Sequence, residues 1–200
     1  HNVVYILLFL FLFSAAGFSQ HSVPEWSKGV VWYQIFPERF YNADSLNDPE
    51  ASKTLINSEK DTTGWRITPW TSDWFAESAW EKARSGNRRD HLYERRYGGD
   101  IEGIIRKLEY LKRLGINGIY LNPVFEAVSL HKYDGSSFHH IDVNFGPDPE
   151  GDRKLMESET PDDPKTWVWT SADKLFLELI KKIHEKGMYI IIDGVFNHTG

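Results

Sequence analysis

The chain has 200 residues, of which 40% are hydrophobic and 26% charged. This composition is typical of a globular domain with one sizeable core, and it argues against disorder, a collagen-like chain and a multi-span membrane protein. The formal charge of -6 repels a phosphate backbone and argues against nucleic acid as a partner, and the absence of cysteine excludes disulfides and thiolate metal ligands.

The N-terminus carries an apolar segment over residues 3–18, VVYILLFLFLFSAAGF. It is shorter than the roughly 20 residues that a membrane-spanning helix needs, and small residues follow it. We interpret residues 1–19 as a secretory signal peptide whose start is incomplete, since the chain opens with His1, and residues 20–29 as a short linker. A buried N-terminal helix is the alternative. The first interpretation predicts a secreted or periplasmic protein without a stable membrane anchor.

The first regular elements lie between residues 30 and 121. The run VVWYQIFP at 30–37 predicts a buried strand. No convincing regular element follows over residues 38–97, and a loop of that length in a compact domain is typically functional. Apolar residues then recur at helical spacing over 101–114 and end at Gly115, and INGIYL at 116–121 predicts a second strand.

A second long loop is predicted over residues 124–169. Thr170, with Asp173 three residues later, is typical of a helix start; the helix runs to Gly187, and MYIII at 188–192 predicts a third strand. The alternation of strands and helices predicts an α/β protein with a parallel sheet. Polar residues gather after the strand ends, where both doubly wound sheets and (β/α)8 barrels bind ligands, so the pattern leaves these two folds open.

Five motifs then narrow the choice. DGVFNH at 193–198 follows the third strand, and it is preceded by VWYQIFPERF at 31–40, YGGDIEG at 97–103, GINGIYLNPVFEA at 115–127 and HKYDGSSFHHIDVNFG at 131–146. Together and in this order they resemble the alpha-amylase family, glycoside hydrolase family 13. The resemblance implies that residues 30–200 form the first three β/α units of a (β/α)8 TIM barrel, with long loops at the C-terminal face of the strands.

The resemblance also implies a sugar-binding site. His198 would hydrogen-bond the sugar just before the scissile bond, and Tyr133 would stack on the same ring, although a purely structural role for the tyrosine is an even alternative. Asp134 and Asp193 would orient neighbouring groups by ion pairing rather than act in catalysis. Ser137-Phe138 and Val143 depart from residues frequent in the family, which affects the expected substrate preference.

A second group of residues suggests calcium. Oxygen-bearing side chains with the spacing N-x-D-x-x-N-D begin at Asn42, and Gly98-Gly99-Asp100 follows later. Such oxygens suit Ca²⁺, but turn formation in a polar loop is the alternative from the residues alone. The group resembles the calcium site of the cyclomaltodextrinase and neopullulanase branch, which implies as ligands Asn42, Asp44, Asn47, Asp48, the Gly98 carbonyl and Asp100.

Other polar clusters give weaker signals. The histidines at 131, 139 and 140 lack the spacing of a zinc site and are expected in a polar loop. The acidic run from Asp148 to Asp163 is expected to be a solvated loop.

The catalytic residues of the family are not in this sequence. A retaining glycosidase needs two carboxyl groups about 5–5.5 Å apart. In this family they follow the fourth and fifth strands, so we expect them beyond Gly200. The resemblance therefore predicts the N-terminal fragment of a secreted hydrolase of alpha-glucans such as starch and maltodextrins, inactive by itself. The alternatives are a non-catalytic homologue that acts as a binding or transporter-associated protein, and a genuine short module that binds calcium or sugar.

Overall fold

The computed structural model describes residues 23–54, 64–198 and 200. The chain divides into two units, one ending at Val30 and one spanning Val31–Gly200. The described part of the first unit holds a single 3-10 turn, Glu25–Ser27. The predicted signal peptide lies outside the described residues, as does the start of the predicted linker. None of the helices that the structure describes has the length and apolar character needed to cross a membrane.

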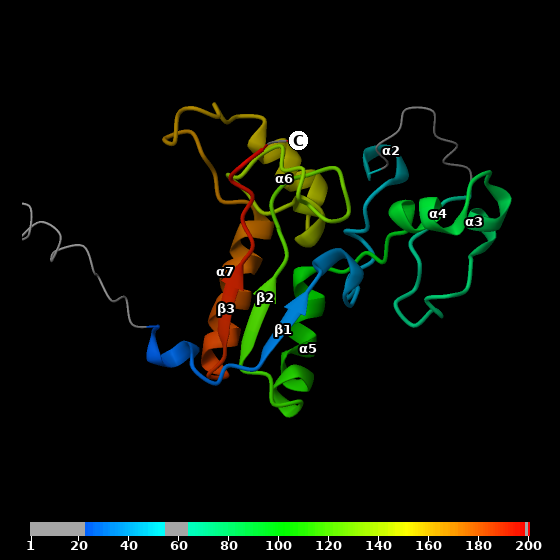
Figure 1. Cartoon of the computed structure of the whole chain (residues 1–200). Coiled ribbons are helices and arrows are strands. Elements are labelled where there is room, and N and C mark those ends of the chain that lie inside the picture. The colour runs from blue at the N-terminus through cyan, green and yellow to red at the C-terminus, as the bar shows by residue number, and fades with distance from the viewer. Residues whose placement is uncertain (1–22, 55–63, 199) are drawn as a thin grey trace, which may run out of the picture. The chain divides into compact units, whose positions relative to one another are not determined.

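The second unit is built on a parallel three-stranded sheet (Figure 1). Its strands are β1 (Trp32–Ile35), β2 (Gly118–Leu121) and β3 (Tyr189–Ile192), and they lie side by side in chain order. The register pairs Tyr33 with Ile119 and Ile119 with Ile190. The three strands and their parallel direction are therefore as the sequence predicted.

Two amphipathic helices make the crossovers between the strands. Helix α5 (Ile101–Arg113) joins β1 to β2, and α7 (Ser171–Glu185) joins β2 to β3. Helix α7 has the predicted cap, since Thr170 Oγ1 accepts a hydrogen bond from Asp173 N. Helix α5 is capped by Asp100, which was predicted only as a calcium ligand and which accepts a hydrogen bond from Gly103 N. The two helices pack against each other and so lie on the same face of the sheet. Helices on one face of strands that follow chain order are typical of a (β/α)8 barrel and not of a doubly wound sheet.

The hydrophobic core lies between the sheet and these helices. Residues of β1 and β2 meet the apolar faces of α5 and α7, and the loops after β1 and β2 close the core. Its members are Ile35, Phe40, Ile101, Ile104, Leu108, Leu111, Ile119, Leu121, Val124, Ile141, Phe145, Ala172, Phe176, Leu179, Ile183 and Met188.

The two segments predicted as loops contain short helices. These are α2 (Ala51–Thr54), α3 (Ala79–Ala83) and α4 (Arg88–Glu94) after β1, and α6 (Pro149–Met156) after β2, together with the 3-10 turns Pro37–Arg39 and Val143–Phe145. The helices are too short to show an apolar period. For α3 and α4 the capping residues were the available signal, because an N-terminal cap followed three residues later by an acidic side chain is typical of a helix start.

The acidic run from Asp148 to Asp163 is not a solvated loop throughout. Asp148 caps α6, and Asp152 is buried at 3% exposure. The Asp152 carboxylate accepts hydrogen bonds from Ser171 N at 2.7 Å, Ser171 Oγ at 2.8 Å and Ala172 N at 3.0 Å. These are the otherwise unpaired donors at the start of α7, so Asp152 joins the two helices.

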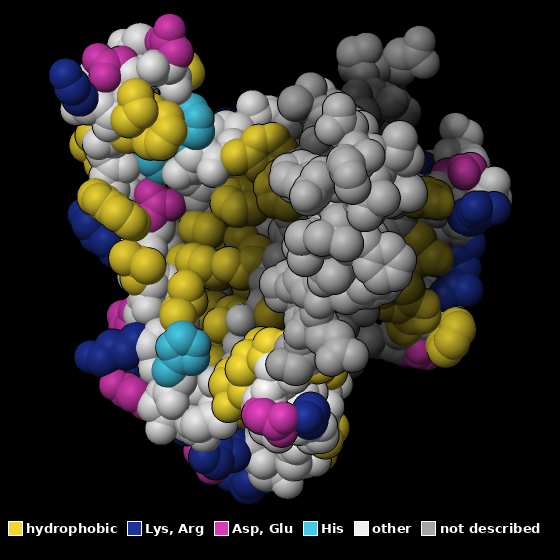
Figure 2. All heavy atoms as spheres, turned by 60° about the vertical axis from the view of Figure 1, so that its left-hand side comes forward, with side chains coloured by type: hydrophobic (Ala, Val, Ile, Leu, Met, Phe, Trp, Pro, Cys, Tyr) yellow, Lys and Arg dark blue, Asp and Glu magenta, His cyan; other side chains and the backbone are white. Residues whose placement is uncertain are grey.

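Hydrophobic side chains gather at the surface on the side of β3 (Figure 2). In the described part of the chain β3 pairs only with β2, and three of its four residues are exposed, Tyr189, Ile191 and Ile192. Phe196, after the strand, is 95% exposed. An apolar strand in a parallel sheet is ordinarily covered on both faces, so this patch has the character of an interior surface.

Candidate functional site

Polar side chains meet at the C-terminal edge of the sheet. Gln34, on β1, donates from Nε2 to Asn122 Oδ1 directly after β2, at 2.7 Å. Asp193 directly follows β3, and its backbone N–H continues the ladder by donating to Leu121 O at 2.8 Å. Parallel strands bring their carboxyl ends to one edge, and this edge is where barrels bind their substrates.

Tyr133 is tied to the end of β3. Its hydroxyl donates to Asp193 Oδ2 at 2.5 Å across 60 residues of sequence. This hydrogen bond, together with burial, raises the pKa of Tyr133 to about 12. The Tyr120 hydroxyl bonds the same carboxylate, which also raises the pKa of Tyr120. The structure therefore brings together Tyr133 and Asp193, and their contact fixes the loop after β2 over the sheet edge.

Asp134 holds the turn that precedes it. Its carboxylate accepts hydrogen bonds from the Ser129 hydroxyl and, at 3.1 Å, from Ser129 N, and it lies 4.0 Å from His131 Nδ1. Burial raises the pKa of Asp134, but the Ser129 hydrogen bonds outweigh burial and the pKa lies below its ordinary value. Asp134 thus contacts its neighbours mainly by hydrogen bonds to Ser129, whereas the prediction was ion pairing.

His198 lies exposed beyond β3. Its Nδ1 is 3.0 Å from Asn197 Oδ1. Gly200 N donates to Gly135 O at 3.0 Å, so the segment that carries His198 returns to the loop that carries Tyr133. The exposed imidazole offers a hydrogen-bonding group and the half-buried ring of Tyr133 offers a flat apolar face, and both kinds of group suit a sugar.

The predicted calcium ligands are gathered between β1 and α5. Asp100 Oδ2 accepts from Ala43 N and Asp44 N, both at 2.9 Å, and Asp48 Oδ1 accepts from Asn42 Nδ2 at 2.5 Å. Gly98, at φ +67°, closes the group: a Cβ there would lie 2.2 Å from Asp48 Oδ1. Only glycine therefore fits between these side chains.

Two features of this group bear on whether it could hold a cation. The pKa of Asp48 is raised to about 6 by burial and by the nearby carboxylates of Asp100 and Asp44. Asn47 is 2% exposed, and its Oδ1 is buried without a hydrogen-bond partner. A hard cation would neutralise the carboxylates and supply the missing partner, provided that the Asn42 amide turns over to present its oxygen.

The donor set is one of mixed oxygens. Within the described ranges, no three His, Cys, Asp or Glu side chains are grouped as a metal site. The group around Asp100 instead combines carboxylates with amide and backbone carbonyl oxygens, as Ca²⁺ binding loops do.

His140 lies in the predicted loop, but it is buried there. It is 6% exposed, with Nδ1 at 2.7 Å from Asp173 Oδ2 and Nε2 at 2.9 Å from Glu159 Oε2. Burial lowers the pKa of His140, but the two carboxylates outweigh burial and raise it. The histidine therefore binds the loop before α7 to the first turn of that helix.

Sequence reasoning missed Gln34, Tyr120 and Asn122 as residues of the sheet edge. The available signal was that all three are polar or hydroxyl-bearing residues at or just after the C-terminal end of an apolar strand, where barrels bind their substrates. The register that brings Gln34 to Asn122 across 88 residues cannot be read from either segment alone.

Comparison with known proteins places these features in context. Residues 34–160 match the family described as "Alpha amylase, catalytic domain". The intracellular maltogenic amylase of Bacillus subtilis is 35% identical over 199 residues, which cover 100% of this chain and 24% of that protein. The cyclomaltodextrinase of Thermoanaerobacter pseudethanolicus is 36% identical over 177 residues, covering 88% of this chain and 21% of that protein.

Solved structures show the same likeness. The cyclic alpha-maltosyl-(1→6)-maltose hydrolase of Arthrobacter globiformis, in complex with cyclic alpha-maltosyl-(1→6)-maltose, superposes with a TM-score of 0.56 at 27% identity. The match covers 90% of this chain and 28% of the hydrolase. The chain thus spans about a quarter of the length of the relatives it matches.

Proposed function

The chain belongs to the alpha-amylase family of glycosidases, and from this premise we propose that it supplies the first three β/α units of the barrel of a retaining alpha-glucan hydrolase. The hydrogen bond from the Tyr133 hydroxyl to Asp193 supports this proposal most directly. It joins two loops at the C-terminal edge of the sheet, where (β/α)8 enzymes bind substrate. Tyr133 offers its ring face to one sugar, and His198 offers a hydrogen bond to the same sugar.

The catalytic carboxyl groups are proposed to come from strands that follow β3. One would act as nucleophile and the other as general acid, with water then hydrolysing the glycosyl intermediate. The exposed apolar surface of β3 supports this arrangement, because a fourth parallel strand and further barrel residues would cover it. Tyr133, Asp134 and Asp193 position the sugar in this scheme and transfer no proton to it.

Substitution at the sheet edge tests the proposal in the protein that contains this chain. We expect His198→Ala to lower kcat/KM on maltodextrin by about 10- to 100-fold, because a hydrogen bond to the substrate is lost. Tyr133→Phe keeps the ring and should cost about tenfold, whereas Tyr133→Ala removes the stacking surface as well. Release of reducing ends is the measurement.

Lys181→Ala, at an exposed position on α7, serves as the control and should leave the rate unchanged. Wild-type rates in both His198→Ala and Tyr133→Ala would contradict the proposed site. Binding of maltodextrin without release of reducing ends by the unmodified protein would instead indicate a non-catalytic homologue.

We further propose that the group around Asp100 holds a structural Ca²⁺. The ligands would be Asn42, Asp44, Asn47, Asp48, the Gly98 carbonyl and Asp100. The unpartnered Asn47 Oδ1 and the crowded carboxylates support this assignment. When bound, the ion would offset carboxylate repulsion and fasten the loop after β1 to the start of α5.

Calcium removal should lower the thermal stability. At a calcium concentration 100 times Kd, the stabilisation is about 2.7 kcal/mol, so chelation is expected to lower Tm by several degrees. Asp44→Asn should reduce this calcium-dependent difference, since the amide still accepts the turn hydrogen bond from Leu46 N but lacks the charge. Asp73→Asn alters a matching turn onto Phe75 N and should not change the difference. A Tm unaffected by EGTA would contradict the site.

A further inference from the structure

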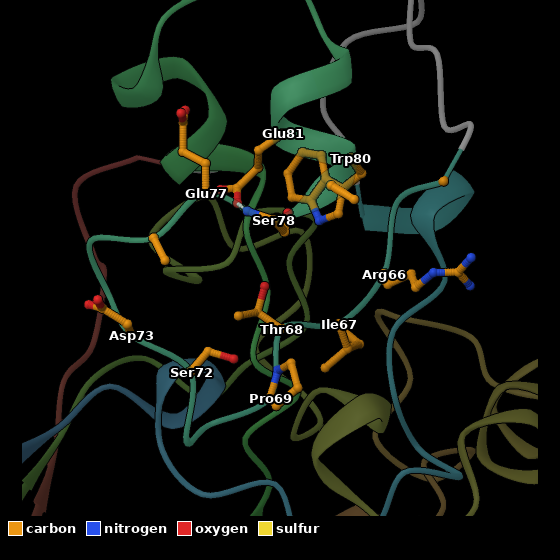
Figure 3. Close-up of a pocket in the computed structure, with 13 residues that line it drawn as sticks. Arg66, Ile67, Thr68, Pro69, Ser72, Asp73, Glu77, Ser78, Trp80 and Glu81 are labelled. Atoms are coloured by element: carbon orange, nitrogen blue, oxygen red, sulfur yellow. Dashed lines mark hydrogen bonds between the residues drawn. The ribbon is translucent and has the colours of Figure 1, made fainter.

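A separate cavity of about 260 Å³ lies in the segment between β1 and α5, and we call it the Trp80 pocket (Figure 3). It shares no residue with the sheet edge or with the predicted calcium ligands. Its lining comprises Gly64, Arg66, Ile67, Thr68, Pro69, Ser72, Asp73, Ala76, Glu77, Ser78, Ala79, Trp80 and Glu81. The volume is slightly below the range of about 300–1,000 Å³ that holds drug-sized ligands, so the cavity suits a small molecule.

The walls of the Trp80 pocket are held in place by a buried arginine. Arg95 is 1% exposed and donates from Nε to Glu81 Oε1 at 2.7 Å. Its other nitrogens donate to the carbonyl oxygens of Trp74 and Ala76, both at 3.0 Å. These bonds fix the loop that forms one wall against the helix that carries Trp80. The cavity is therefore part of an ordered structure.

Trp80 Nε1 and Thr68 Oγ1 are buried polar atoms of lining residues that have no hydrogen-bond partner. Trp80 is 4% exposed and Thr68 is 7% exposed, yet neither Trp80 Nε1 nor Thr68 Oγ1 makes a hydrogen bond. The indole edge and the threonine side chain face each other across the cavity in Figure 3. A buried donor or acceptor left unpaired is costly, so a ligand that bonds both atoms would recover that free energy.

The charges of the lining disfavour an anionic ligand. Among the described lining residues Arg66 is the only basic one, whereas Asp73, Glu77 and Glu81 are acidic. An anion would be repelled, and a cation offers no acceptor, so it would leave the indole N–H of Trp80 unpaired. The remaining surface alternates apolar groups, among them Ile67 and Pro69, with hydroxyl groups. A pyranose ring has matching apolar faces and hydroxyl groups that both donate and accept.

We propose that the Trp80 pocket binds a single hexopyranose unit of an alpha-glucan, as a second sugar site distinct from the sheet edge. The indole N–H of Trp80 donates to one sugar oxygen, and the Thr68 hydroxyl bonds another. The choice of an alpha-glucan rests on the proposed function, whereas the neutral polyhydroxylated class rests on the pocket itself. Such a site would hold a polymer chain near the enzyme while another part of it reaches the sheet edge.

Maltose titration of the protein with ¹⁵N-labelled indole nitrogens tests this site. The Trp80 resonance is identified by its loss in Trp80→Phe. We expect it to shift saturably with maltose in the unmodified protein and in Thr68→Ser, which keeps the hydroxyl. In Thr68→Val the Kd read from this resonance should rise about three- to tenfold, as for the loss of one neutral hydrogen bond.

The outcomes separate this site from the proposed function. A Trp80 resonance that stays fixed at maltose concentrations that saturate the sheet edge would overturn the second site, as would an unchanged Kd in Thr68→Val. The same titration in His198→Ala should still shift the Trp80 resonance. A shift in a protein that releases no reducing ends would leave the second site standing and contradict only the hydrolase.

Discussion

Replacing Arg95 by methionine is expected to lower the free energy of unfolding by about 3–5 kcal/mol, the largest loss from any substitution considered in this protein. Arg95 and Glu81 are 1% and 0% exposed and form an ion pair at 2.6 Å. Methionine fills a similar volume but leaves the Glu81 carboxylate buried with its main partner removed. It also leaves two loop carbonyl groups, of Trp74 and Ala76, without their donors.

The exposed pair on α5 provides the control for this prediction. Arg106 and Glu102 are joined at 2.8 Å, with side chains 52% and 36% exposed. Arg106→Met should cost at most about 1 kcal/mol, because solvent screens an exposed pair. Urea denaturation measures both variants. A loss in Arg95→Met no larger than that in Arg106→Met would show that the buried pair does not stabilise this segment.

A double substitution separates the buried charge from the lost packing. In Arg95→Met with Glu81→Gln, the uncompensated carboxylate is gone, so the double variant should be more stable than Arg95→Met alone. If the loss in the double variant instead equals the sum of the losses in Arg95→Met and Glu81→Gln, the Glu81 carboxylate finds another partner when Arg95 is absent. The Trp80 pocket should lose maltose binding in Arg95→Met, because its wall is no longer held.

The segment that contains Arg95 also shows where sequence reasoning ends. Strands and long helices were predictable because their apolar residues repeat with a period, as in α5 and α7. Residues 64–97 have no such period, and they are ordered by single long-range bonds. Trp65 Nε1 donates to Glu94 O at 3.0 Å, and Thr68 N donates to Arg96 O at 2.8 Å. No local pattern identifies such partners.

The sequence predicted which residues form the candidate sites, but not how those residues are buried or paired. The motif resemblance located Tyr133, Asp193 and the residues around Asp100, and the structure brings each set together. The resemblance could not show that the pKa of Asp48 is raised or that Asn47 Oδ1 lacks a hydrogen-bond partner, since both follow from burial and from the chain fold. Nor could it show the Trp80 pocket, whose lining falls where the sequence has no recognised motif.

Gly103→Ala is expected to destabilise the protein by about 2–3 kcal/mol, against the intrinsic preference of the helix. Gly103 is buried in the first turn of α5, and a Cβ there would lie 1.7 Å from the backbone oxygen of Tyr41. A backbone oxygen cannot turn aside as a side chain can, so α5 and the loop after β1 would have to separate. In an unobstructed helix the same change stabilises by roughly 0.5–1 kcal/mol. The sign of the change in the free energy of unfolding therefore tests the contact between Gly103 and the Tyr41 oxygen.

Gly151→Ala, in α6, is the matched control. Gly151 and Gly103 both stand three residues after an aspartate cap and both donate their N–H to it. The atoms nearest to a Cβ at Gly151 belong to the Asp148 side chain, which can move, so the effect should stay within about 1 kcal/mol.

Urea denaturation with calcium and with EGTA completes the test. Because Tyr41 leads directly into the Asn42–Asp48 loop, Gly103→Ala should also reduce the calcium-dependent gain in stability, whereas Gly151→Ala should preserve it. Equal calcium effects in the two variants would show that the loop holds its ligands independently of α5.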